Sequence, residues 1–140
     1  MENKAKKLLL SPNTFAVVKD EESYTSRLRG ILPLMELLDK NKKLLKGADA
    51  ADKVIGKAAA MLFYLGGIKR LYTEIISENA LSFLKNTEIE LEFSKVVPYI
   101  INRSGDGMCP MEKLVIEAQS PTQAYELLKE KLRAKREHEK

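Results

Sequence analysis

The sequence has very few of the residues on which metal and thiol chemistry depends. Its 140 residues include one cysteine, Cys109, one histidine, His138, and no tryptophan. A single thiol cannot form an internal disulfide and suits a reducing compartment, so we predict a cytoplasmic protein. Zinc sites need several His and Cys ligands, and a Ser or Cys nucleophile needs a His partner. We therefore predict no metal site and no His-activated nucleophile.

Aromatic residues and charge of one sign are also scarce. Aromatic residues make up 6% of the chain, and 24 basic against 20 acidic residues leave a formal net charge of +4. Without a basic patch or a platform of stacking aromatics, we do not expect nucleic-acid binding. The basic residues 1–10 contain only three consecutive leucines. That run is too short for a secretory signal or a membrane span, so we expect no membrane association.

What remains is an ordinary globular composition, with 44% hydrophobic and 31% charged residues. A chain of this length fits one domain and can bury roughly two-thirds of its unfolded surface. We predict a single domain over residues 1–140, with residues 1–12 as an N-terminal extension and residues 134–140 as a frayed, charged tail. The sequence has no internal repeat and is compatible with a homodimer.

Strand and helix patterns alternate along most of the chain. The predicted strands cover residues 14–19, 23–28, 70–76 and 88–93, and the first two form a hairpin. The predicted helices cover residues 30–47, 51–65 and 78–85, and two more begin near Pro110 and Pro121. Alternating strands and helices favour parallel pairing with right-handed crossovers. The predicted fold is a three-layer α/β/α sandwich around a mixed sheet of four to five strands.

The predicted helix over residues 51–65 is surrounded by apolar groups but begins with charged ones. Asp49 and Asp52 have the spacing of the first and last residues of a capping box, which explains them structurally. Lys53 and Lys57 are four residues apart and would share one face of this helix. Either the two lysines reach solvent along their aliphatic stems, or they face a ligand cleft beside Asp52.

Residues 102–113 form a second candidate segment. Cys109 precedes Pro110, and proline is favoured as the first residue of a helix. A thiol at a helix N-terminus can be acidic and reactive, whereas the structural alternative is a small buried hydrophobic side chain. Glu112 and Lys113, one turn later, would cap that helix end or form an ion pair there.

Ser77 and Glu78 begin the next predicted helix, where Ser77 fits the N-cap and Glu78 the first turn without any further function. Ligands of α/β sheets bind outside the carboxyl ends of the parallel strands. We therefore expect Asp52, Lys53, Ser77 and Glu78 to surround one cleft, with residues 102–113 as its wall or lid.

Four stretches resemble a small prokaryotic family catalogued as domain of unknown function 1893. They are residues 51–59 (ADKVIGKAA), 76–78 (ISE), 97–103 (VPYIINR) and 107–113 (GMCPMEK). The resemblance implies a cytidine-deaminase-like fold. In zinc deaminases the buried helix begins with His-x-Glu, and a later helix begins with Pro-Cys-x-x-Cys. Here these places hold Asp52-Lys53-Val54 and Ser77-Glu78-Asn79, so the chain is not expected to be a zinc-dependent deaminase.

The resemblance leads to a first hypothesis of a zinc-free, deaminase-like protein that binds a nucleotide or nucleotide-derived ligand at the N-terminus of the buried helix. Asp52 would hold ribose hydroxyls or act as a base or nucleophile, and Lys53 or Lys57 would neutralise phosphate, with Arg103 as a second anion clamp. The catalytic candidates are Asp52, Lys53 and Cys109. The ligand-binding candidates are Lys57, Ser77, Glu78, Asn102, Arg103, Glu112 and Lys113. The alternative is a non-catalytic regulatory or protein-interaction module without a small-molecule site, and the sequence does not decide whether the protein is an enzyme.

Overall fold

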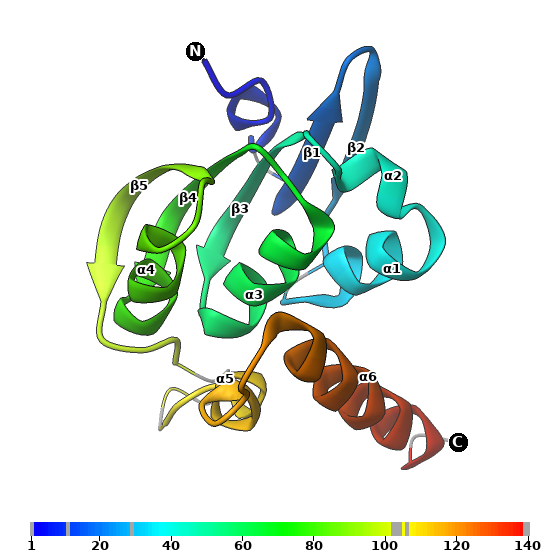
Figure 1. The fold of residues 1–140 in the computed structure, drawn as a ribbon, viewed down its shortest axis with the longest axis vertical. Coiled ribbons are helices and arrows are strands. Elements are labelled where there is room, and N and C mark those ends of the chain that lie inside the picture. Colours follow the sequence, from blue (N-terminus) through cyan, green and yellow to red (C-terminus); the bar gives the residue numbers. More distant parts are fainter. Residues whose placement is uncertain (1, 11, 29, 102–104, 106, 139–140) are drawn as a thin grey trace.

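A computed structural model of the chain describes residues 2–10, 12–28, 30–101, 105 and 107–138 (Figure 1). Five strands form one sheet in the order β2-β1-β3-β4-β5. They are β1 Phe15–Lys19, β2 Glu22–Ser26, β3 Asp49–Ile55, β4 Arg70–Ser77 and β5 Glu90–Val97. β1 pairs antiparallel with both β2 and β3, whereas β3, β4 and β5 run parallel. The prediction of an α/β protein with a mixed sheet is therefore confirmed.

The hairpin of β1 and β2 has a two-residue turn, Asp20 and Glu21. Asp20 adopts a positive φ of 53°. Two-residue hairpin turns require positive φ, because their twist must match the twist of the strands, and Asp tolerates this conformation better than most residues. The local sequence thus explains the first supersecondary unit.

The helices gather around α3: α1 and α4 lie beside it on one face of the sheet, and α5 and α6 pack against it beyond the lower edge of the sheet (Figure 1). Their bounds are α1 Leu32–Lys40, α2 Lys42–Leu45, α3 Lys57–Gly66, α4 Glu78–Lys85, α5 Pro110–Val115 and α6 Pro121–His138. α3 is buried from Ala58 to Phe63, as expected of a helix that is apolar on nearly all sides. Gly67 ends α3 in the left-handed conformation, with φ of 80°, and its N–H bonds back to Phe63 and Tyr64.

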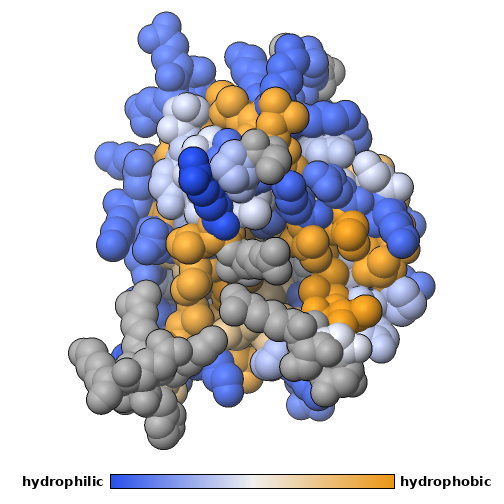
Figure 2. All heavy atoms as spheres, turned by 180° about the vertical axis from the view of Figure 1, so that it is seen from behind, coloured by the Kyte–Doolittle hydropathy of each residue, from blue (hydrophilic) through white to orange (hydrophobic). Residues whose placement is uncertain are grey.

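The opposite face of the sheet is covered by the N-terminal segment with the single 3-10 turn η1, Lys6–Leu8. A small apolar cluster forms there from Ala5, Leu9, Ala16 and Ala51. Figure 2 looks at the molecule from behind, where apolar surface (orange) remains exposed between charged side chains (blue). The sequence predicts a layer of helices on this face of the sheet. Within the described residues, the N-terminal segment with η1 is what covers this face instead.

One predicted element is wrong. Residues 51–55 belong to strand β3, and the buried helix begins only at Lys57. β3 is a central strand buried on both faces, so it lacks the alternation that marks a half-buried strand. Without alternation along Asp49–Ile55, periodicity alone cannot distinguish this strand from the start of a buried helix. β3 was not among the four predicted strands, and it makes the sheet five-stranded.

Other boundaries also differ from the predictions, and the strand predicted over residues 23–28 is β2, Glu22–Ser26. The helix predicted over residues 30–47 is two helices, because Asn41 between them has an extended φ of −151°. β5 begins two residues later than predicted and continues to Val97. Among the residues that the structure describes, no helix is long and apolar enough to cross a membrane.

Candidate functional site

The carboxyl ends of β3 and β4 lie side by side at one edge of the sheet, since Ile55 pairs with Ile76. The chain continues from β3 through Gly56 into α3 and from β4 directly into α4. The N-termini of both helices therefore face the same edge. Most of the predicted site residues lie on these segments or on α5.

Glu112 of α5 caps the N-terminus of α3. Its carboxylate accepts hydrogen bonds from the main-chain N–H of Lys57 at 2.9 Å and of Ala58 at 3.3 Å. Burial raises the pKa of Glu112, and the two N–H groups and the Lys57 charge oppose that shift. The free N–H groups that would attract a ligand phosphate are thus already occupied by a side chain of the protein.

This cap depends on Gly56. A Cβ atom at this position would lie 1.5 Å from Oε1 and 2.2 Å from Cδ of Glu112. Gly56 has φ of −103° and ψ of −175°, a conformation that any residue adopts, so the requirement for glycine is purely steric. The sequence predicted a capping role for Glu112 at its own helix, whereas the structure places the carboxylate on a helix that starts 55 positions earlier.

The two lysines do not share a helix face. Lys53 lies in β3, where its N–H donates to the carbonyl of Thr14 at 3.1 Å, and its side chain is half-buried. Lys57 is the first residue of α3, and its ammonium donates to the carbonyl of Ile116 at 3.0 Å. Lys57 therefore ties α3 to the end of α5.

Asp52 is buried in the middle of the sheet and does not belong to a capping box. It pairs with Phe15 of β1 and Thr73 of β4, and only 9% of it is exposed. Burial is the largest influence on the pKa of this carboxyl, and the main-chain N–H groups of Val54 and Lys53 act against it. Burial raises its pKa well above the usual value. Asp52 therefore keeps its proton to a higher pH than an ordinary aspartate.

In β3 and β4, the alternation of side chains between the two faces of the sheet is broken near Asp52. Ala50 and Ile55 of β3 both contribute to the core under the helices, although they are five residues apart. Leu71 and Ile76 of β4 do the same. A regular strand would point residues five apart to opposite faces, so both strands must be irregular between these positions. The side chain of Val54, two residues after Asp52, is exposed.

Ser77 is confirmed as the N-cap of α4, because its hydroxyl accepts the N–H of Ala80 at 3.1 Å. Glu78 lies in the first turn and is exposed. Cys109 precedes α5, as predicted, and is half-buried. Its N–H donates to the carbonyl of Ile100 at 2.8 Å. Lys113 of α5 is exposed, and the candidates Asn102 and Arg103 lie outside the described residues.

The family model TM1506, a domain of unknown function (DUF1893), matches residues 4–132. The chain belongs to this family. It is similar to the crystal structure of a DUF1893 family protein (TM1506) from Thermotoga maritima, with a TM-score of 0.82 and 24% identity over 94% of this chain and 92% of the other. At that identity the likeness shows the shared fold. No curated protein matches the sequence.

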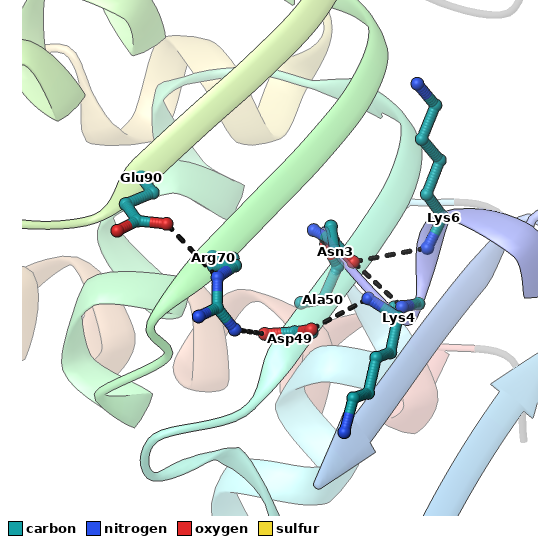
Figure 3. A network of polar contacts seen from close by, with 8 residues as sticks. Asn3, Lys4, Lys6, Asp49, Ala50, Arg70 and Glu90 are labelled. Atoms are coloured by element: carbon teal, nitrogen blue, oxygen red, sulfur yellow. Dashed lines mark hydrogen bonds and ion pairs between the residues drawn. The ribbon is translucent and has the colours of Figure 1, made fainter. Parts of the chain in front are cut away.

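A second polar cluster in this DUF1893 chain lies at the amino ends of the parallel strands, on the face that η1 covers (Figure 3). Asp49 bonds to Arg70 of β4 at 2.9 Å, and Arg70 in turn bonds to Glu90 of β5 at 3.1 Å. The other oxygen of Asp49 accepts the N–H of Lys4 at 2.7 Å, while the Asn3 amide donates to Ala50 at 3.1 Å. Asp49 is therefore a structural residue that fixes the N-terminal segment. This cluster has no local signal in the sequence, because its members lie in four separate segments.

The expected single cleft is only partly formed. The carboxyl edge brings together Lys57, Ser77, Glu78 and Glu112, but Asp52 lies deeper inside the sheet. An open groove of about 660 Å³ lies at the opposite edge, lined by residues that include Tyr64, Lys69, Asn86 and Glu88. In the described part of the chain, no three His, Cys, Asp or Glu side chains gather as a metal site.

Proposed function

We propose that the protein binds a nucleotide or nucleotide-derived molecule near the carboxyl edge of β3 and β4, with Asp52 as the recognition group. The observation that carries the proposal is the burial of Asp52 in the middle of the sheet, where only 9% of the residue is exposed and the pKa of its carboxyl is raised by that burial. Burying a carboxyl without a cation destabilises a fold, and titratable groups perturbed in this way cluster at functional sites. The cytidine-deaminase-like fold implied for the family is part of the same proposal and is the reason for naming the nucleotide class.

Burial favours the protonated form of the Asp52 carboxyl. A protonated carboxyl donates a hydrogen bond, so it can bind a carbonyl oxygen or an unprotonated ring nitrogen of a nucleobase. A phosphate cannot take the N-terminus of α3, since Glu112 fills it. Lys53, half-buried and adjacent to Asp52, is then the better candidate for the phosphate than Lys57, which is bound to Ile116.

The other candidates keep weaker support. Ser77 and Glu112 each have a capping partner that explains their position. Glu78, Lys113 and the half-buried Cys109 lie on segments around the edge, and we retain them as ligand contacts on that basis together with Asn102 and Arg103.

One observation favours the alternative of a protein-interaction module. Large apolar side chains are exposed on β5 and on the segment that follows it: Phe93, Val96, Tyr99 and Ile101. Contiguous exposed apolar side chains mark interaction surfaces more often than small-molecule sites.

Melting curves with nucleosides, nucleotides and nucleotide sugars test the small-molecule proposal. A ligand that binds only the folded state stabilises it, by about 2.7 kcal/mol at a ligand concentration 100 times the dissociation constant. This stabilisation raises the melting temperature. We expect one ligand class to stabilise the wild type and Glu36→Gln, a control at an exposed glutamate of α1. Asp52→Leu, which keeps a similar volume but can neither donate nor accept a hydrogen bond, should lose this stabilisation. A panel without any shift, or equal shifts in all three proteins, would refute the proposal.

A further inference from the structure

The open groove of about 660 Å³ is separate from the site proposed at the carboxyl edge. It lies at the amino ends of β4 and β5, which are at the upper edge of the sheet in Figure 1. Its walls come from three parts of the chain: Gly47 before β3, Tyr64 and residues 67–69 at the end of α3, and residues 86–89 between α4 and β5. Its volume is within the range of about 300–1,000 Å³ that is typical of small-molecule sites.

Main-chain hydrogen bonds tie these three segments to one another. The N–H of Gly47 donates to the carbonyl of Gly67 at 2.8 Å, and the N–H of Lys69 donates to the carbonyl of Ala48 at 2.8 Å. The N–H of Glu90 donates to the carbonyl of Lys69 at 3.0 Å. The walls of the groove are therefore fixed before a ligand arrives, which lowers the entropic cost of binding.

One wall of the groove carries an exposed aromatic ring. Tyr64 of α3 is 49% exposed, and its ring meets the ring of Phe83 of α4 edge to face, with the centroids 5.8 Å apart. Ile68 and Ile89 add apolar surface to the lining. Because aromatic rings favour offset stacking and edge-to-face contacts, this wall suits a ligand that carries a ring.

Two opposite charges line the same groove. Lys69 and Glu88 are both exposed, and neither forms an ion pair with any residue that the structure describes. α4 ends three residues before Glu88, and the partial negative charge of a helix C-terminus favours a cation on the same side. Lys46 adds a second cation to the other side, since its Cγ lies 3.8 Å from the position of a Cβ on Gly67.

We propose that this groove binds a free aromatic amino acid. The carboxylate of the ligand binds Lys69, its ammonium binds Glu88, and its ring packs on Tyr64. Such a ligand satisfies both charges of the groove and its apolar wall at the same time. A nucleotide carries only negative charge outside its base, so its phosphates would be repelled by Glu88 and by the end of α4. The two sites thus differ in the class of molecule that they bind.

The first test locates the ligand by two-dimensional NMR of the ¹⁵N-labelled, full-length protein titrated with L-phenylalanine. We expect the amide signals of Gly47, Gly67, Lys69 and Glu88 to shift along one saturation curve, because these residues line the groove. The signal of Ser77, at the opposite edge, should stay in place. No shift up to the solubility limit of L-phenylalanine, or shifts confined to the carboxyl edge, would overturn the proposal.

The second test removes one charge at a time from the ligand. N-acetyl-L-phenylalanine lacks the ammonium, and L-phenylalaninamide lacks the carboxylate. Each should bind the wild type about two- to fivefold more weakly than L-phenylalanine, as expected for the loss of one exposed ion pair. Glu88→Gln should weaken L-phenylalanine by the same factor but should not weaken N-acetyl-L-phenylalanine further, because both changes remove the same contact.

Lys69→Gln has a matched control in Lys42→Gln, at an exposed lysine of α2 outside the groove. Lys69→Gln should weaken L-phenylalanine about two- to fivefold and leave L-phenylalaninamide unaffected, whereas Lys42→Gln should change neither. Equal affinities of the wild type for L-phenylalanine and both analogues, or equal losses in Lys69→Gln and Lys42→Gln, would contradict the assignment of the two charges.

Discussion

Gly56→Ala should destabilise the protein, although its backbone conformation suits alanine. A Gly→Ala change at a compatible position normally stabilises a protein by about 0.4–1 kcal/mol, because it restricts the unfolded chain. Here the added Cβ would lie 1.5 Å from Oε1 of Glu112, so the carboxylate must leave the N-terminus of α3. The effect of Gly56→Ala is therefore predicted from a side chain on another helix.

The magnitude follows from the two hydrogen bonds that Glu112 makes. Loss of a helix N-cap costs about 0.5–2 kcal/mol, and a buried N–H without a partner costs about 1–3 kcal/mol. The N–H of Ala58 is buried, so we expect Gly56→Ala and Glu112→Ala each to cost about 2–3 kcal/mol. For a chain of this size, that loss lowers the melting temperature by roughly 6–12 °C.

The two substitutions should not be additive. Once Glu112 is alanine, the Cβ at Gly56 meets no carboxylate, and Gly56→Ala should become neutral or slightly stabilising. Urea unfolding of the two single variants and the double variant, followed by helix circular dichroism, measures this coupling. Additive losses, or a Gly56→Ala protein as stable as the wild type, would refute the steric account of the cap.

Two further predictions concern the other buried acids. Folding raises the pKa of Asp52, so the wild type should lose stability relative to Asp52→Asn as the pH rises from about 3.8 to the pKa of the folded state. The expected loss is about 1.4 kcal/mol per pH unit. A stability difference that stays constant with pH would contradict the burial of this carboxyl. Arg70→Met leaves the buried Asp49 without its cation and should move the midpoint of urea unfolding to a lower concentration, whereas an unchanged midpoint would show that this ion pair does not stabilise the fold.

Features with a local cause were predictable from the sequence. The hairpin and the strand at β4 have β-branched and aromatic runs, and α4 has Ser77 as its N-cap with Glu78 in the first turn. In each case the residues that decide the structure are within a few positions of one another. The α/β class follows from the order of such segments, and the family resemblance from the short stretches around Asp52 and Cys109.

Only the tertiary structure decided the roles of the charged residues. Asp49 and Asp52 fit a capping box by spacing, yet they lie in β3, where Asp49 binds Arg70 and Asp52 is buried. Glu112 caps α3 from another helix, at a glycine that leaves room for its carboxylate. Spacing along the chain specifies neighbours only when the secondary structure is known. A strand buried on both faces hides its periodicity, so the partners of its side chains emerge only when the sheet and the helices assemble.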